Sequence, residues 1–218
     1  MKNWIDIYDE IALKYNDPIS MSGYLINGNP ISIEYFIDWF NYIQSNINIV
    51  KDSKIIDVGC GSGIFLEFFQ QISNNIYGID TSLNQIQKAK ELVPNANFNN
   101  GDALNFGFDD CTFDLIFCNS VFLLFESLDY AQNVLQYFIS RLNINGKIWI
   151  GDLPGNDISL DVNYRRKGKS INLELQHYPV SFFDDFCEKN GYKGTKIEQT
   201  FKKEEFQNNR FDYKIELI

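Results

Sequence analysis

A short apolar strand that runs straight into a glycine-rich turn and a helix constrains this 218-residue chain more than any other feature. It spans Ile55–Leu66 and reads IIDVGCGSGIFL. Glycines permit a tight turn and let a ligand approach the bare backbone, while the free N–H groups at the start of the helix face that ligand. The segment therefore predicts a nucleotide or cofactor site at the carboxyl end of a strand.

The spacing within this turn narrows the kind of ligand. A phosphate-cradling GxxxxGK[ST] loop needs a lysine after the glycines, and none is present. The dinucleotide fingerprint needs glycine or alanine at position 64, which is Ile64 here. The observed pattern is Asp-x-Gly-x-Gly-x-Gly, beginning at Asp57. An acid at that place suits a ligand whose nearby end carries an ammonium or hydroxyl group, not a pyrophosphate.

Strands and helices alternate after residue 50, which predicts an α/β fold with a Rossmann-like, doubly wound and mostly parallel sheet. Two late strands with little helix between them predict a C-terminal hairpin, and hence one antiparallel strand at an edge of the sheet. The predicted strands are 54–58, 76–80, 96–99, 113–118, 147–151, 195–200 and 211–217, and the predicted helices are 62–72, 83–92, 130–142 and 180–189.

The first fifty residues are expected to form a helical extension. Apolar residues recur at helical spacing over 4–15 and 31–47, and residues 16–30, rich in Gly, Asn and Ser, are expected to form a loop. No repeat or Pro/Ser-rich linker marks a boundary. We therefore predict a single domain, with a helical cap over 1–50 and a core over 51–218.

Composition bounds the partners and the compartment. A hydrophobic share of 44% predicts a packed globule, and no apolar run is long enough to span a bilayer. The acidic start, MKNWIDIYDE, lacks the apolar core of a secretory signal, which favours a cytoplasmic location. The net charge of −10 repels a phosphate backbone, so nucleic acid is not the expected partner. The basic run at Arg165, Arg166, Lys167 and Lys169 is interpreted as a solvated loop, with contact to an anionic substrate group as the alternative.

Metal and disulfide chemistry are not expected. The four cysteines form no CxxC pair, and three lie in apolar or Gly-rich stretches, so buried free thiols are predicted. His177 is the only histidine, which argues against a His-based metal site.

From about Tyr8 to the C-terminus the chain resembles class I S-adenosylmethionine-dependent methyltransferases that act on small molecules. Four motifs in the right order carry the resemblance: the glycine turn, then YGIDTS (77–82), GDA (101–103) and FDLIFCN (113–119). The resemblance implies S-adenosylmethionine as cofactor and S-adenosylhomocysteine as product. The expected chemistry is in-line transfer of the methyl group to a hydroxyl or amine of a metabolite or sugar.

The resemblance also assigns residues to parts of the cofactor. The first motif is expected to wrap the methionine part, Asp80 to accept from both ribose hydroxyls, Asp102 to accept from the adenine amino group, and Asn119 to lie beside the methyl donor. Tyr15 belongs to an N-terminal helix that resembles one closing over the cofactor in many small-molecule members. The implied cofactor-binding residues are Tyr15, Asp57, Gly59, Gly61, Gly63, Asp80, Thr81, Asp102, Ala103 and Asn119.

The acceptor and the general base are less constrained. Asn119-Ser120-Val121-Phe122 lacks the Asn-Pro-Pro-Tyr that marks many methyltransferases of adenine or protein amides, which lowers the case for those substrates. We hypothesise that His177 faces the acceptor as general base, the alternative being a surface or structurally bonded histidine. Asp152 is a weaker candidate. The acceptor is expected between the N-terminal helices and residues 153–178.

Two other functions stay open on the sequence alone. An NAD(P)-dependent oxidoreductase shares the strand, the glycines and the acid after the second strand, although Ile64 and the motif around Asp102 count against it. A catalytically silent S-adenosylmethionine-binding protein would carry the same motifs, because they report binding and not transfer.

Overall fold

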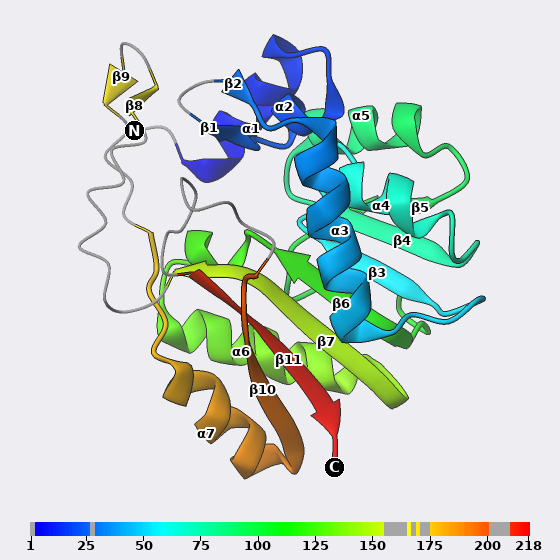
Figure 1. The fold of residues 1–218 in the computed structure, drawn as a ribbon, viewed down its shortest axis with the longest axis vertical. Helices are drawn as coiled ribbons and strands as arrows, with labels where there is room; N and C mark the ends of the chain where they lie inside the picture. The colour runs from blue at the N-terminus through cyan, green and yellow to red at the C-terminus, as the bar shows by residue number, and fades with distance from the viewer. Residues whose placement is uncertain (1–2, 27–28, 155–164, 167–168, 171–174, 201–209) are drawn as a thin grey trace.

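A computed structural model gives the structure of the chain and describes residues 3–26, 29–154, 165–166, 169–170, 175–200 and 210–218 (Figure 1). Within these residues, seven strands form one sheet in the order β10-β11-β7-β6-β3-β4-β5. Their bounds are β3 Ile55–Val58, β4 Ile76–Asp80, β5 Asn97–Asn100, β6 Phe113–Asn119, β7 Leu142–Pro154, β10 Tyr192–Glu198 and β11 Arg210–Leu217.

The direction of the strands confirms the mostly parallel sheet with a C-terminal hairpin. Strands β3 to β7 pair in parallel, and β11 pairs antiparallel with both β7 and β10. The prediction that the antiparallel strand lies at the edge was wrong, because β11 lies inside the sheet and β10 forms the edge. Burial explains the order: Phe211, Tyr213 and Ile215 of β11 are buried, whereas β10 alternates between exposed and half-buried residues.

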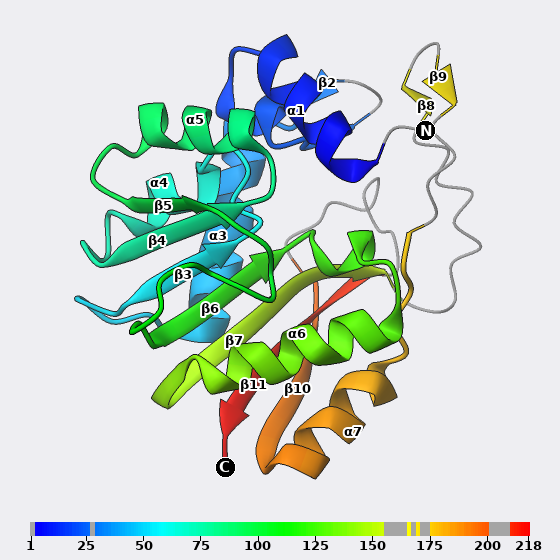
Figure 2. The same cartoon turned by 180° about the vertical axis from the view of Figure 1, so that it is seen from behind.

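Helices cover both faces of the sheet, as the doubly wound prediction requires. On one face, α3 (Ile33–Ile47), α4 (Ile64–Phe69) and α5 (Leu83–Leu92) pack on the sheet through an apolar cluster that includes Phe36, Phe69 and Phe117. On the other face, α6 (Leu128–Ser140) and α7 (Val180–Asn190) form a second cluster. Figure 2 shows α6 and α7 in front of the sheet and α3 behind it.

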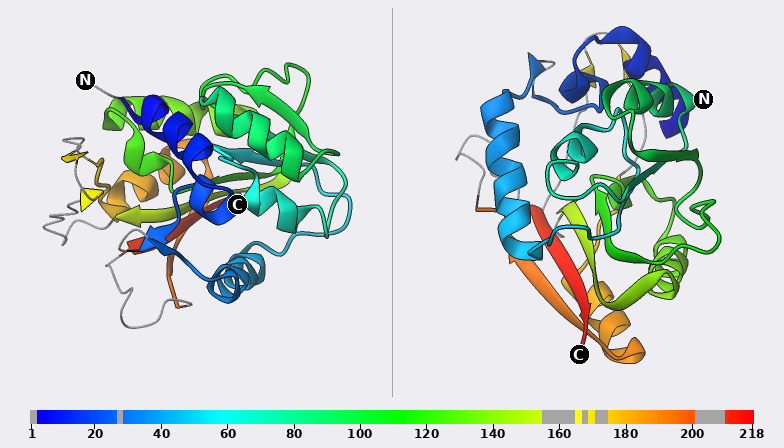
Figure 3. Two further views of the ribbon diagram at one scale, coloured as in Figure 1. Left: turned by 90° about the horizontal axis from the view of Figure 1, so that it is seen from above. Right: turned by 90° about the vertical axis from the view of Figure 1, so that its right-hand side faces the viewer.

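The N-terminal extension is more structured than predicted. Helix α1 (Trp4–Lys14) is followed by α2 (Pro18–Met21), a strand pair β1 (Leu25–Ile26) and β2 (Asn29–Pro30), and then α3. The predicted loop over 16–30 was therefore wrong. Its helix forms because Pro18 stands at the first helical position and the Asp17 side chain accepts a hydrogen bond from Ser20 N. Helices α1 and α2 lie beside α5 (Figure 3).

Three smaller elements complete the described structure. A 3-10 helix, η1 (Phe122–Leu124), follows β6, and β8 (Arg165–Arg166) pairs with β9 (Lys169–Ser170). The side chains of the basic run at 165–169 lie outside the described part of the structure, as do most residues of the expected acceptor region. Among the helices that the structure describes, none combines the length and the apolarity needed to cross a membrane.

Candidate cofactor-binding site

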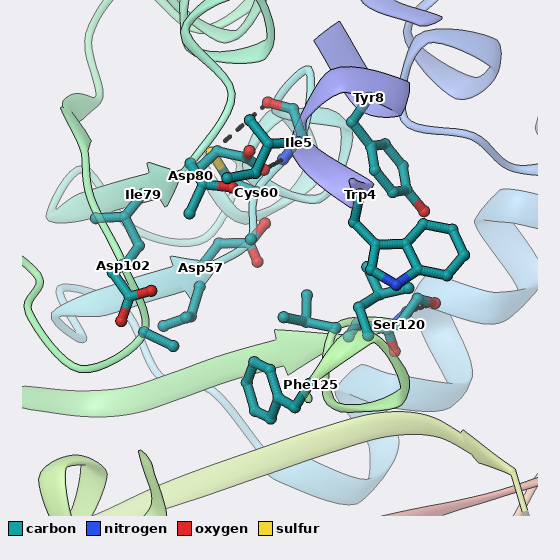
Figure 4. Close-up of a pocket in the computed structure, with 18 of the residues that line it drawn as sticks. Trp4, Ile5, Tyr8, Asp57, Cys60, Ile79, Asp80, Asp102, Ser120 and Phe125 are labelled. Carbon is teal, nitrogen blue, oxygen red and sulfur yellow. Dashed lines mark hydrogen bonds between the residues drawn. The ribbon is translucent and has the colours of Figure 1, made fainter. Parts of the chain in front are cut away.

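A cavity of about 480 Å³ opens at the carboxyl ends of β3, β4 and β6 (Figure 4). Parallel α/β sheets bind ligands at this edge, where strand order reverses between neighbouring strands. Helix α1 contributes Trp4, Ile5 and Tyr8 to the lining, and the segment after β6 contributes Ser120 and Phe125. The cavity therefore joins the glycine turn to elements that are distant from it in sequence.

The glycine turn supplies a stretch of backbone that side chains would block. Gly59, Gly61 and Gly63 have φ angles of +76°, +54° and +87°, a region that disfavours other residues. A Cβ on Gly59 would lie 2.3 Å from Val121 Cγ2, and one on Gly61 would lie 2.8 Å from Ser22 Oγ. Gly59 and Gly61 line the cavity, whereas Gly63 caps α4 and packs against Ala89, outside the lining.

Asp57 carries a buried carboxylate in the cavity wall. Its exposed fraction is 2%, and Oδ2 has no hydrogen-bond partner among the described residues. Burial raises the pKa of Asp57 well above its ordinary value, and the charge of Asp80 raises it further. An unsatisfied buried acceptor is costly unless a ligand supplies a donor. Asp57 therefore suits an ammonium or another strong donor.

Asp80, the last residue of β4, lines the cavity and also accepts a hydrogen bond from the backbone of the glycine turn. Its Oδ2 accepts from Gly61 N at 2.9 Å and its Oδ1 from Ser82 N at 2.8 Å. Burial raises the pKa of Asp80 to about 6, although the two backbone donors oppose that shift. Each oxygen keeps a further lone pair with which it can accept from a ligand. Thr81, next along the chain, also lines the cavity.

Asp102 and Ala103 form another part of the wall. The Asp102 carboxylate accepts from Leu104 N at 2.8 Å and from the hydroxyl of Tyr130, which lies 2.9 Å from both oxygens. Ala103 is buried beside it and leaves room for a ligand.

Asn119 and Ser120 close the end of β6. Asn119 is buried, its Oδ1 has no partner among the described residues, and its Nδ2 donates to Ser120 Oγ at 3.1 Å. Ser120 donates in turn to Asp152 Oδ2 at 2.9 Å, which also accepts from Arg210. Ser120 and Asp152 both have positive φ, +58° and +62°, a strained conformation that is common at functional sites. Asp152 itself does not line the cavity.

Two predicted site residues lie elsewhere. Tyr15 follows α1 at its C-terminal end, where its hydroxyl accepts from Lys14 Nζ, and it does not line the cavity. It stands seven residues, about two helical turns, beyond Tyr8, which does line the cavity. His177 is half-buried shortly before α7 and is also absent from the lining. The assignments of Tyr15 to the cofactor and of His177 to catalysis stay predictions without support from this cavity.

Sequence reasoning missed several lining residues. Tyr8 was placed in a helix expected to close over the cofactor but was not named as a binding residue, Trp4 was interpreted only as part of the apolar face of that helix, and Tyr24 was placed in a loop without a role. The missing information was the position of α1, which polar contacts to α5 fix. Ser82 Oγ donates to Asp9, and Gln85 Nε2 donates to Tyr8 O at 3.1 Å. Spacing identifies a helix face but not what that face covers.

A metal ion has no evident place here. Within the described residues no group of three or more His, Cys, Asp or Glu side chains is arranged to hold one.

Comparisons with known proteins agree with this geometry. Residues 55–146 match a family described as a methyltransferase domain. The chain is 24% identical over 164 residues to a probable non-canonical nonribosomal peptide synthetase of Salinispora arenicola, and 33% identical over 94 residues to a demethylmenaquinone methyltransferase of Staphylococcus epidermidis. These matches cover 70% and 40% of this chain, but only 2% and 39% of the relatives.

Solved structures share the fold. An amino pentose methyltransferase of Micromonospora echinaspora, solved with S-adenosylmethionine bound, superposes with a TM-score of 0.65 at 12% identity, covering 99% of each chain. Residues 55–146 therefore match a methyltransferase domain, and the described chain shares the fold of this S-adenosylmethionine-bound methyltransferase.

The residues present fit the cofactor of this family. The buried Asp57 Oδ2 lacks a donor, and S-adenosylmethionine carries an ammonium group that can donate. The turn leaves backbone open where Cβ atoms at Gly59 and Gly61 would collide with neighbours. The volume of about 480 Å³ lies within the range of small-molecule cofactor sites.

Proposed function

We propose that this chain transfers the methyl group of S-adenosylmethionine to a hydroxyl or amine of a small molecule, a metabolite or a sugar. The observation that carries the proposal is the buried Asp57 carboxylate, unsatisfied at Oδ2, in a cavity that the glycine turn, Asp80 and Asp102 also line. These are the positions that the family resemblance assigns to the methionine, ribose and adenine parts of the cofactor. A cavity wall rich in acceptors supports a donor-rich, cationic ligand.

When bound, the cofactor would supply a sulfonium methyl group: the acceptor lone pair attacks the methyl carbon in line, the C–S electron pair leaves with sulfur as a neutral thioether, and the acceptor's proton passes to solvent. The protein's part is to hold and to orient. Asp57 would pair with the ammonium end and Asp80 with the ribose hydroxyls, while the open backbone at Gly59 and Gly61 permits close contact. Asn119 and Ser120, at the end of β6, would lie nearest the transferred group.

The acceptor class is inferred from the cavity and the relatives. Trp4, Tyr24 and Phe125 also line the cavity and offer flat side chains against which a ring can pack. The relatives named above act, by their names, on a demethylmenaquinone and an amino pentose, both small molecules. Nucleic acid stays an unexpected partner because of the net charge of −10, and a cytoplasmic location stays a prediction.

The proposal is tested by transfer of a labelled methyl group. The protein is incubated with methyl-labelled S-adenosylmethionine and a panel of amino sugars, quinols, phenols and short amines, and labelled products are separated by mass. Transfer to a panel member above the Asp57→Asn control supports the proposal. Binding of the cofactor without transfer to any class would instead favour the silent binding protein.

A further inference from the structure

Tyr130 is held rigidly at the edge of the cavity. It is the third residue of α6, and Ser127 caps that helix by accepting from Tyr130 N at 3.1 Å. The Tyr130 ring packs edge-on against Phe125 at a centroid distance of 5.0 Å, and Phe125 packs against buried Phe122 at 4.7 Å. The backbone and the ring of Tyr130 are therefore each fixed by a neighbour.

The hydroxyl of Tyr130 reaches Asp102, an exposed acid in the cavity wall. Asp102 follows β5 and forms an isolated bridge with Asn105. The Tyr130 hydroxyl lies 2.9 Å from both carboxylate oxygens, so its single hydrogen is shared between them, and Leu104 N donates to Oδ1 at 2.8 Å. A carboxylate has about four lone-pair sites, so acceptor capacity remains for a ligand.

Tyr130 keeps its proton for this contact. Burial raises the pKa of Tyr130 above its ordinary value, and the hydrogen bond and charge of Asp102 raise it further. The phenol therefore stays a donor at neutral pH.

We infer that Tyr130 is a positioning residue that fixes the Asp102 carboxylate, so that its remaining lone pairs select an amino group over a carbonyl on the bound base. The inference rests on the proposed function, in which Asp102 accepts from the adenine amino group. A 6-oxo purine would point a carbonyl oxygen at these lone pairs, and two facing acceptors repel.

The test compares two ligands that differ at the 6-position of the base and in the proton that the 6-oxo base carries on N1. S-adenosylhomocysteine and S-inosylhomocysteine, its 6-oxo counterpart, are titrated by calorimetry into wild type, Tyr130→Phe and Tyr137→Phe. Tyr137 is the matched control because it lies on the same helix and accepts from Phe106 N at 3.1 Å, but does not line the cavity. Removing the Tyr130 hydroxyl is expected to weaken binding of the adenosyl ligand by roughly 3- to 10-fold. The affinity for the inosyl ligand is expected to change less than about twofold, so the preference for the adenosyl over the inosyl ligand becomes smaller.

The outcomes separate the two claims. Equal weakening of both ligands in Tyr130→Phe, or no weakening of either, overturns the positioning role, since a merely structural tyrosine does not alter selectivity. The positioning role is supported if the ratio of the affinities for S-adenosylhomocysteine and S-inosylhomocysteine falls in Tyr130→Phe and stays unchanged in Tyr137→Phe. Failure of wild type to bind S-adenosylhomocysteine at all overturns the proposed function, and the role of Tyr130 with it.

Discussion

Two buried carboxylates, one at each half of the sheet, differ in how they are satisfied. Asp57 of β3 and Asp212 of β11 are 2% and 0% exposed. Burial raises the pKa of Asp57 well above its ordinary value and that of Asp212 to about 6. Asp212 accepts from Asp152 N, Gln199 Nε2 and the Tyr42 hydroxyl, at 2.7, 2.7 and 2.8 Å. Asp57 keeps an oxygen, Oδ2, to which no described residue donates a hydrogen bond.

The difference separates a structural acid from a ligand-binding one. The donors to Asp212 come from β7, from the segment after β10 and from α3, so this carboxylate ties three parts of the protein together. Asp57 lines the cavity and ties nothing together through Oδ2. Both side chains are buried, and the pKa of each is raised. What distinguishes the structural acid from the ligand-binding acid is therefore whether described residues donate hydrogen bonds to its oxygens.

The largest expected effect is on cofactor binding when the charge of Asp57 is removed. Asp57→Asn should weaken S-adenosylhomocysteine binding by about 30-fold or more, because the ligand ammonium loses a buried charged partner. The ligand-free protein should unfold at the same or a higher temperature, since a costly buried charge is gone. Titration calorimetry and thermal unfolding measure both. Lower stability with unchanged affinity would make Asp57 a structural residue like Asp212.

The opposite pattern is expected at Asp212. Asp212→Ala leaves three donors without their acceptor and should lower the free energy of unfolding by about 2–4 kcal/mol. Binding of S-adenosylhomocysteine should stay within about threefold of wild type, because Asp212 does not line the cavity. Urea unfolding and calorimetry give the two numbers. A loss of affinity as large as that in Asp57→Asn would break the distinction.

The raised pKa of Asp212 predicts a definite pH dependence. Its pKa is about 6 in the folded protein and 3.8 ordinarily, so the folded state holds this proton more tightly. The resulting stabilisation is fully present below about pH 3.8 and is lost as the pH rises through about 6, at up to roughly 1.4 kcal/mol per pH unit. The stability difference between wild type and Asp212→Asn, measured by urea unfolding from pH 4 to 7, should shift in that direction. A flat difference would mean that Asp212 titrates normally.

The smallest effect concerns the contacts that hold α1 against the cavity. Ser82 and Ser32 are both helix N-caps, of α5 and α3, and replacing either with alanine should cost about 1 kcal/mol of stability. Only Ser82 also donates to Asp9 of α1, so only Ser82→Ala should weaken S-adenosylhomocysteine binding, by roughly 2- to 5-fold. Calorimetry on the pair of variants tests this. Equal affinities would show that α1 needs no such contact to cover the ligand.

The parts of this molecule that local patterns determine could be predicted. Short apolar runs predicted strands β3, β4, β6 and β7, and the pattern of acid and glycines in the first turn pointed to the cavity edge, which Asp57, Gly59 and Gly61 line. Long-range packing could not be read in the same way. The place of β11 inside the sheet depends on pairing with β7, some 60 residues away, and the role of Trp4 depends on where α1 docks. Tyr15 shares a helical spacing with Tyr8, but spacing does not say how far along the helix the cavity extends.

One titration tests the central claim most directly, namely that the cavity at the carboxyl ends of β3 and β4 binds S-adenosylmethionine. Wild type is titrated with S-adenosylmethionine, S-adenosylhomocysteine, NAD and NADP, with Asp57→Asn and the remote Asp212→Asn in parallel. Saturable one-to-one binding of the first two ligands is predicted, weakened in Asp57→Asn, retained in Asp212→Asn and absent for the dinucleotides. Binding of NAD or NADP with no response to either sulfur-containing ligand would contradict the account.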